Sequence, residues 1–257
     1  RSIRESVGVK VEIIVITSDE ELATQGVSGC KVRYDSGMPA AKRNKGAIVA
    51  TGKYLAFFDD DVEIESDCLL NFYTTLESNP TVGMVYGKLF KADEPTRFDE
   101  AGGYITSSGF IWSRAGQNIV DIGQYDETVE ILAGKSASCM CTRAAFGGVR
   151  GFDEDFEILG EETDLSWRMW LKGWKVLFVP KARGIHYFNT KFKPAKEYYT
   201  SERVHRNGSR NYLTMLFKNL GKEHLWIIPL HFLIWFIASL AMIGTLKVTE
   251  GVNIMRG

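Results

Sequence analysis

The stretch that decides the fold is Tyr54-Leu55-Ala56-Phe57-Phe58-Asp59-Asp60-Asp61-Val62. Its apolar first half predicts a strand that is buried on both faces of a sheet. The three carboxylates then fall at the C-terminal end of this strand, where open α/β sheets bind their ligands. Adjacent anions repel one another, and a hard divalent cation with oxygen ligands would offset that repulsion. A solvated acidic turn that caps the next helix is the alternative that this pattern leaves open.

Strands and helices alternate on both sides of this stretch. Apolar and β-branched runs predict strands at 11–16, 54–58, 82–89, 136–143 and 174–179, and helical patterns predict helices at 39–50, 69–76 and 160–173. Pro39 suits the first turn of its helix, whereas Ser66 is expected to cap the next helix and Pro180 to end the last strand. The alternation predicts an α/β fold with a mainly parallel central sheet.

Between Lys91 and Lys135 the regular periodicity disappears, and glycines are spread among aromatic and polar residues. A stretch this long with weak periodicity is more often a functional loop region than a plain connection. We therefore expect this segment to contribute to a binding site rather than to the core of the sheet.

The charge balance argues against one class of function. The 257 residues carry 31 basic and 32 acidic side chains, and a net charge of -1 is unlike that of a nucleic-acid-binding protein. The four cysteines form no Cys-x-x-Cys pair and no zinc-binding spacing with histidine, so we interpret them as reduced thiols of a cytosolic compartment. The polar opening Arg1–Lys10 does not have the pattern of a signal peptide.

The segment Leu225–Leu246 contains no charged residue and meets the requirement of about 20 apolar residues for a membrane span. A buried core helix is the alternative. Basic residues are more numerous before this segment than after it, which predicts that the globular part lies on the cytoplasmic side of the membrane. We expect a globular domain at 1–200, a basic juxtamembrane segment at 201–224, a transmembrane helix at 225–246 and a short tail at 247–257.

Acidic residues open the helix expected at 160–173. Glu161 and Glu162 stand in its first turn, where negative charge suits the helix dipole and where a carboxylate facing a cleft can act as a general base. Asp164 is spaced to pair with Arg168 across one turn. A lone histidine such as His186 is more often structural than a ligand, and it becomes a ligand candidate if the fold brings it near the aspartates.

Taken together, these motifs resemble the family 2 inverting glycosyltransferases, and within them the rhamnosyltransferase-like branch. The resemblance covers roughly Val11 to Asn219. It rests on the order of Asp59-Asp60-Asp61, the run Gly147-Gly148-Val149-Arg150-Gly151-Phe152-Asp153-Glu154, the run from Glu161 to Arg168, Gly173-Trp174-Lys175-Val176, and Val179-Pro180 followed by His186. Members of this family have the Rossmann-like GT-A fold, which binds nucleotide sugars. The resemblance therefore implies a GT-A fold here, with a C-terminal transmembrane helix after it.

The resemblance also implies a metal and nucleotide site. Asp59 and Asp61 would bind Mn²⁺ or Mg²⁺ together with His186, and Asp60 would contact the ribose or the metal. The segment Lys42-Arg43-Asn44 stands where the family has Ala-Arg-Asn, so Arg43 and Asn44 are expected near the nucleotide. Asp59 and Asp60 complete the expected contacts to the nucleotide sugar.

The catalytic base follows from the same resemblance. Glu161-Glu162 matches the family's Glu-Asp pair, whose second residue is the usual base, so we expect Glu162 to be the base and Glu161 to support it. This chain departs from the pattern in having Glu162 where the family has aspartate. The family also has a strand-helix unit before the strand matched by Glu12–Ile16, so we expect a truncated chain. The Gln-x-x-Arg-Trp motif of processive synthases is absent from the sequence, which favours the addition of a single sugar.

The implied reaction moves one sugar, with inversion, from a nucleoside diphosphate sugar to a hydroxyl group of a glycan or lipid-linked acceptor. A metal ion would offset charge on the departing diphosphate, and the base would take the proton of the acceptor hydroxyl. The part of the glycine-rich segment from Gly102 to Gly123 is expected on the acceptor side. Two other classes stay open: a phosphatase or nucleotidyltransferase built on the aspartates, and an inactive, membrane-anchored protein that binds nucleotide sugars.

Overall fold

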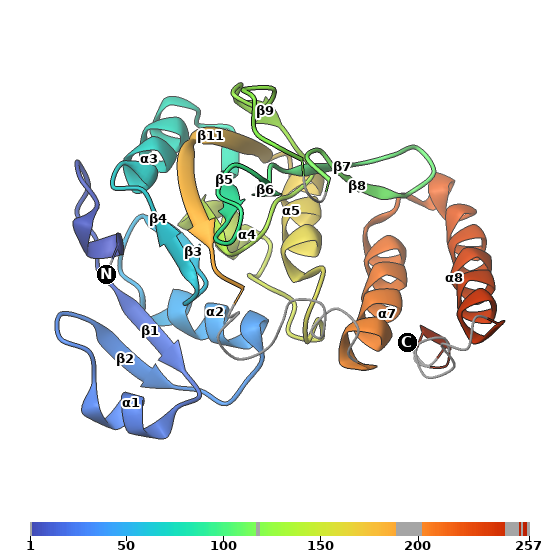
Figure 1. The fold of residues 1–257 in the computed structure, drawn as a ribbon, viewed down its shortest axis with the longest axis horizontal. Helices are drawn as coiled ribbons and strands as arrows, with labels where there is room; N and C mark the ends of the chain where they lie inside the picture. Colours follow the sequence, from blue (N-terminus) through green and yellow to red (C-terminus); the bar gives the residue numbers. More distant parts are fainter. Residues whose placement is uncertain (1, 117–118, 189–201, 245–251, 253, 256–257) are drawn as a thin grey trace.

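The structure is a computed structural model that describes residues 2–116, 119–188, 202–244, 252 and 254–255 (Figure 1). A seven-stranded sheet forms its centre. Five strands lie side by side in the order β3 (Tyr54–Phe58), β10 (Ser138–Thr142), β5 (Val82–Lys91), β11 (Lys175–His186) and β4 (Val62–Ile64). Two short strands join them, β6 (Phe98–Glu100) on β5 and β9 (Val129–Glu130) on β11. The expected α/β fold with a central sheet is confirmed.

The sheet is mixed, which corrects the expectation that it is mainly parallel. Within the described part of this sheet, β5 and β11 are the one parallel pair. The reason is the position of β10, which returns from the glycine-rich segment and pairs antiparallel with both β3 and β5. An antiparallel neighbour needs no crossover helix, so the alternation of strands and helices breaks at this point.

Two hydrophobic cores cover the two faces of the sheet. Along β5, Met84 and Tyr86 face the core that is closed by α2 (Pro39–Val49), α4 (Arg143–Gly148) and α5 (Glu161–Leu171). Val85 faces the other core, which is closed by α3 (Cys68–Ser78). This division follows the two-residue period of a strand. Cys68, Cys139 and Cys141 lie in these cores as free thiols.

A smaller unit precedes the central sheet. After a 3-10 turn, η1 (Ser2–Glu5), the strands β1 (Ile14–Thr17) and β2 (Lys31–Tyr34) form a two-stranded parallel sheet joined by α1 (Glu20–Gln25). Because parallel strands need a crossover, α1 makes the connection, and the Asp19 side chain caps it by accepting from the Leu22 N–H at 3.0 Å.

Three expectations about elements were wrong. Strand β11 does not end at Pro180: it continues to His186, and a register shift between Val179 and Arg183 accommodates the residue that cannot donate a hydrogen bond. Ser66 does not cap α3, which begins at Cys68 with Asp67 in the cap position. The segment from Lys91 to Lys135 also holds regular structure, namely β6, β9 and the hairpin of β7 (Gly103–Ile105) and β8 (Ile111–Ser113).

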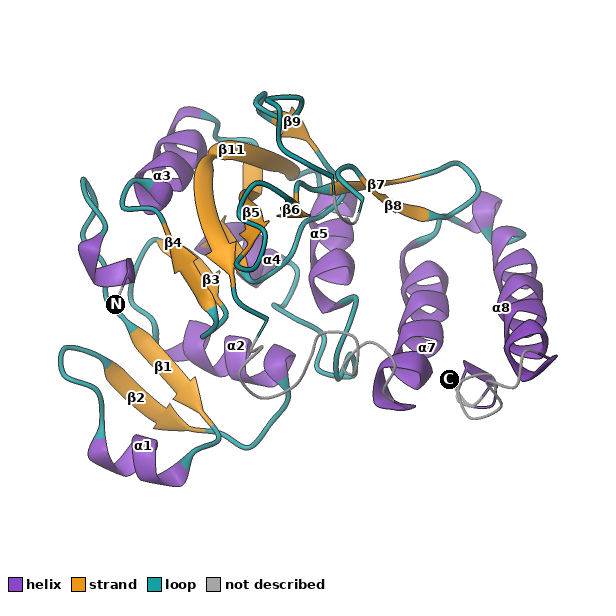
Figure 2. Cartoon of the chain, in the orientation of Figure 1, coloured by secondary structure: helices purple, strands orange, loops and turns teal. Residues whose placement is uncertain are grey.

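The C-terminal part lies beside the sheet. It consists of α7 (Glu202–Asn219), the 3-10 turn η2 (Lys222–His224) and α8 (Ile227–Gly244), and the β7–β8 hairpin reaches over to the start of α8 (Figure 2). The α8 helix is apolar and long enough to cross a membrane, and 17% of it is buried inside the protein. The last two residues of the span expected at 225–246 lie outside the described residues.

Candidate active site

The acidic turn after β3 and the end of β11 meet at one edge of the sheet. Asp59, Asp60 and Asp61 form the turn from β3 into β4, which the Val62 N–H closes by donating to the Asp59 carbonyl at 3.2 Å. Strand β4 then pairs antiparallel with β11 so that His186 stands opposite Val62. The pairing therefore brings a residue of the last strand beside the acidic turn.

This edge contains a candidate metal centre. One ligand atom from each of Asp59, Asp61 and His186 lies within 4.8 Å of the others, so the structure brings together the three residues expected to bind a metal. Two carboxylates and one imidazole suit Mn²⁺, which accepts both oxygen and nitrogen ligands. Asp60 is exposed and does not belong to this cluster. The residues present therefore fit a divalent cation.

His186 is held by carboxylates on both ring nitrogens. Its Nε2 lies 3.3 Å from Asp61 Oδ1, and its Nδ1 lies 2.8 Å from Asp99 Oδ2. Burial alone would lower the pKa of His186, but the hydrogen bonds and charges of Asp61 and Asp99 outweigh it and raise the pKa to about 9. Sequence reasoning missed Asp99, whose nearest signal was its position in the glycine-rich segment.

Arg43 connects the metal cluster to the first turn of α5. Its guanidinium pairs with Asp59 Oδ1 at 2.7 Å and with Glu161 Oε1 at 3.0 Å, and it lies over the Phe152 ring. Burial would lower the pKa of Arg43, but the charges of Asp59 and Glu161 outweigh that effect and raise it. The side chain therefore stays a cation between two anions, with one guanidinium nitrogen directed at each carboxylate.

The two glutamates of α5 differ in their surroundings. Glu161 is buried, and its second carboxylate oxygen has no hydrogen-bond partner in the described part of the chain. Glu162 is half-buried, and its pKa is raised well above the ordinary value, first by burial and then by the neighbouring charge of Glu161. A carboxylate with a raised pKa is better matched to proton transfer near neutral pH.

Asn44 shapes the loop before α5. Its Nδ2 donates to the Phe152 carbonyl and to Glu154 Oε1, and its Oδ1 accepts from the Phe152 N–H, each at 2.9 Å. Gly151 precedes this contact with φ of +70°, and a Cβ there would lie 2.7 Å from Asn44 Oδ1. The observed contacts of Asn44 are thus within the protein, and its expected place near the nucleotide stays a prediction.

Asp164 has the structural role expected from its spacing. Its Oδ2 accepts from Arg168 Nε at 2.8 Å, as predicted. Its Oδ1 accepts from Asn219 Nδ2 and pairs with Lys218 Nζ, both at 3.0 Å. Because Lys218 and Asn219 belong to α7, this buried carboxylate fixes α7 on α5.

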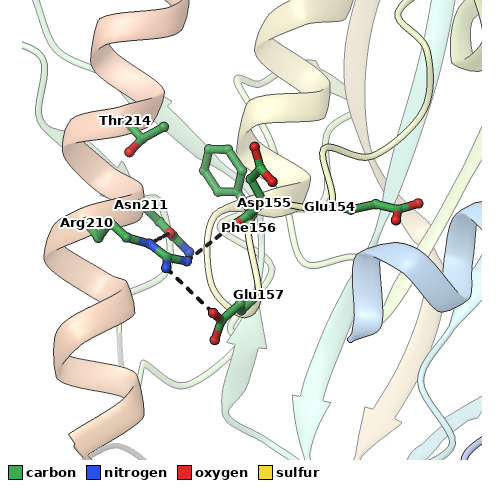
Figure 3. A pocket seen from close by; sticks show the side chains of 7 residues that line it. All are labelled: Glu154, Asp155, Phe156, Glu157, Arg210, Asn211 and Thr214. Carbon is green, nitrogen blue, oxygen red and sulfur yellow. Dashed lines mark hydrogen bonds and ion pairs between the residues drawn. The ribbon is translucent and has the colours of Figure 1, made fainter. Parts of the chain in front are cut away.

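A cleft of about 460 Å³ opens between α7 and the loop that leads into α5 (Figure 3). Arg210 lies across it, donating to the Asp155 carbonyl at 3.1 Å and pairing with Glu157 at 3.7 Å. Asn211 closes one side by donating to the Ile158 and Leu159 carbonyls at 2.8 Å. Sequence reasoning did not find this cleft, because its two walls are far apart in the chain.

Part of this chain is similar to a family of known proteins. Residues 20–138 match the family model described as glycosyl transferase family 2. An O-antigen biosynthesis protein, RfbC of Myxococcus xanthus, is 26% identical over 175 residues, which are 65% of this chain and 14% of that protein. A pre-mycofactocin glycosyltransferase of Mycobacterium tuberculosis is 29% identical over 165 residues, 60% of this chain and 31% of that protein.

A third relative is more similar to this chain, but over a shorter stretch. The N-acetylglucosaminyl-diphospho-decaprenol L-rhamnosyltransferase of Mycobacterium tuberculosis is 42% identical over 53 residues, which are 20% of this chain and 17% of that protein. The chain therefore spans less than a third of the length of each of these relatives.

Solved structures share the fold. A structure of GalNAc-T7 with UDP, GalNAc and Mn²⁺ has a TM-score of 0.57 at 17% identity, and the match covers 80% of this chain and 42% of that one. The mannosyltransferase PcManGT of Pyrobaculum calidifontis, in complex with GDP-Man and Mn²⁺, has a TM-score of 0.56 at 14% identity, covering 99% and 79%. The expected GT-A fold is confirmed.

Proposed function

We propose that this protein moves one sugar, with inversion, from a nucleoside diphosphate sugar to an acceptor hydroxyl, because residues 20–138 match the glycosyl transferase family 2 model. The observation that carries the proposal is the gathering of Asp59, Asp61 and His186 into one cluster, joined through Arg43 to Glu161. The family match and the names of the relatives favour transfer over the phosphatase and the inactive binding protein.

In this proposal the metal cluster and the two glutamates of α5, which Arg43 connects, have different chemical roles. A cation held by Asp59, Asp61 and His186 would supply the Lewis acid for the departing diphosphate. Glu161 is paired with Arg43, so Glu162 is the carboxylate proposed to take the acceptor's proton as the new bond forms. Arg43, Asn44, Asp59 and Asp60 are the residues proposed to meet the nucleotide sugar.

We place the acceptor on the side of α7 and the glycine-rich segment. Support comes from the cleft of about 460 Å³, which borders the loop ending at the first turn of α5. The names of RfbC and of the rhamnosyltransferase speak of O-antigen and of a diphospho-decaprenol sugar, respectively. A glycan or lipid-linked acceptor is therefore the class we propose for this protein.

A lipid-linked acceptor would suit a membrane-anchored enzyme. We propose that α8 anchors the chain with its catalytic domain on the cytoplasmic side. Support comes from the apolar surface of α8 and from the hairpin beside it, where Trp112 is 62% exposed and Tyr104 48% exposed. Aromatic side chains of this kind favour the interface between membrane and water. His231 Nε2 of α8 donates to the Ser108 carbonyl in the loop of that hairpin at 2.7 Å, so the two elements are in contact.

The proposal is tested by removing one carboxylate of the metal cluster. Wild type should be stabilised against heat by UDP, GDP or dTDP, more strongly with Mn²⁺ than without. Asp61→Ala should lose the Mn²⁺-dependent part of this stabilisation and remain folded, because Asp61 lies in a turn rather than in a core. The measurement is the melting temperature over a nucleotide titration.

Asp67→Ala is the matched control, since it removes an exposed carboxylate whose side chain makes no cap hydrogen bond. Metal-dependent nucleotide binding that is equal in Asp61→Ala and wild type would contradict the proposed site.

A further inference from the structure

Three contacts hold the His186 ring, and the proposed function does not account for one of them. Its Nε2 faces Asp61, and the ring of Phe188 stacks on its face with centroids 4.1 Å apart and planes at 23°. The third contact is between Nδ1 and Asp99 Oδ2, at 2.8 Å. Asp99 belongs to β6, so this contact joins residues 87 positions apart in the sequence.

Asp99 is buried, and each of its two carboxylate oxygens has a partner. Its side chain is 3% exposed, and its second oxygen, Oδ1, pairs with Lys135. Lys135 also lies over the Phe188 ring, with Nζ 4.9 Å from the centroid. One basic side chain thus offsets the buried carboxylate and covers the ring that stacks on His186. A buried carboxylate without such a partner would be costly.

The position of Asp99 relative to the metal cluster is the decisive point. The cluster within the described residues contains Asp59, Asp61 and His186 but not Asp99, which contacts the opposite nitrogen of the imidazole ring. In metal sites the ring N–H that does not face the ion is almost always donated to a carboxylate, a backbone carbonyl or water, and this contact fixes the ring's orientation and tautomer.

We propose that Asp99 is the positioning residue of this metal centre, which rests on the proposed function of the Asp59–Asp61–His186 cluster. Through its contact with Nδ1, Asp99 holds the imidazole ring with Nε2 on the side of Asp61, where a cation would be bound. Lys135 holds the second oxygen of Asp99, so Asp99 does not turn towards the ion itself.

The test compares Asp99→Asn with Asp93→Asn, which removes a carboxylate from an exposed residue in the loop before β6. The first readout is the dissociation constant for Mn²⁺ alone, measured by electron paramagnetic resonance without any sugar donor. Loss of an outer carboxylate partner typically weakens metal binding by about 10–100-fold. We expect a loss in that range for Asp99→Asn and none for Asp93→Asn.

The second readout needs no metal. In protein labelled with ¹⁵N-histidine, the His186 Nδ1–H should give a downfield proton resonance that exchanges slowly with water, because it is hydrogen-bonded to a buried carboxylate. Asp99→Asn should move this resonance upfield or remove it. Because wild type alone must show the resonance, a variant that fails to fold does not prevent the test.

The outcomes separate this inference from the proposed function. Equal Mn²⁺ affinity in folded Asp99→Asn and wild type, or no protected Nδ1–H in wild type, overturns the role of Asp99. If wild type binds no Mn²⁺, the proposed metal site fails, whereas a protected Nδ1–H that disappears in Asp99→Asn still supports the hydrogen bond that positions His186.

Discussion

At the scale of single residues, Glu161 and Glu162 show how one step along a helix gives two carboxyl groups different surroundings. Successive helical residues point about 100° apart. Glu161 therefore meets Arg43 at 3.0 Å, while Glu162 has no such cation at hydrogen-bond distance among the described contacts. The result is a raised pKa for Glu162, caused first by burial and then by the charge of Glu161.

Glutamine substitutions should separate these two roles. Glu162→Gln keeps the shape and removes the basicity, so kcat should fall by about 10²–10⁴-fold while donor affinity stays nearly unchanged. Glu161→Gln should lower kcat less and lower the melting temperature more, because it breaks a buried pair with Arg43. Steady-state kinetics and thermal unfolding of both variants measure this. An inactive Glu161→Gln beside an active Glu162→Gln would reverse the assignment.

The pH dependence of turnover adds a second residue-scale prediction. A general base works in its deprotonated form, so kcat should rise with pH through the pKa of Glu162. The charge of Glu161 contributes to raising that pKa, and removing the charge should lower it. The rising limb of the pH–rate profile of Glu161→Gln should therefore lie at lower pH than that of wild type. A limb that stays in place or moves to higher pH would show that Glu162 is not the group that titrates.

At the scale of elements, a buried lysine attaches the glycine-rich segment to the sheet. Lys88 of β5 is fully buried, and its Nζ pairs with Asp121 Oδ2 at 2.9 Å and with Asp126 Oδ1 at 2.5 Å. The side chain also lies over the Phe98 ring. The two aspartates flank the turn at Gly123, so one strand residue holds both ends of that turn.

Removing the two carboxylates that pair with Lys88 should lower the free energy of unfolding more than removing Lys88 itself. The double variant Asp121→Asn/Asp126→Asn leaves Lys88 charged and buried, and it should lower the free energy of unfolding by about 3–5 kcal/mol. Lys88→Met should cost less, because Asp121 and Asp126 are 16% and 51% exposed and water can reach them. Urea unfolding measures both. A larger loss for Lys88→Met would show that the lysine's contacts with the rings, rather than its charge, hold the segment.

At the scale of the whole molecule, the candidate active site and the apolar helix lie on different parts of the structure. The sheet carries the Asp59–Asp61–His186 cluster. Asp164 of α5 accepts from Asn219 of α7, and α7 is followed in the chain by α8. The 18 residues of α8 span about 27 Å, close to the ~30 Å of a bilayer's hydrocarbon core. Its exposed face holds Phe232, Leu233 and Phe236, which gives a membrane a continuous apolar surface to contact.

A charge on that face should release the protein from membranes. Leu233→Arg places a cation near the middle of α8, where insertion would become less favourable by about 2.5–3.5 kcal/mol. The variant should shift from the membrane fraction towards the soluble fraction after a high-salt wash. Leu171→Arg, at an exposed position of α5, should not shift. Fractionation that is the same for Leu233→Arg and wild type would argue for another anchor.

The sequence by itself determined the local features of this protein. The apolar run into Asp59, the helix opened by Pro39 and the acidic first turn at Glu161 all appear where their patterns predicted them. The tertiary structure alone decided which of them meet: Arg43 with Glu161 across 118 positions, and His186 with Asp99 across 87. It also decided the antiparallel place of β10. The physical reason is that periodicity records which face of an element is buried, whereas strand order and register, which bring distant side chains together, depend on the packing of the whole sheet.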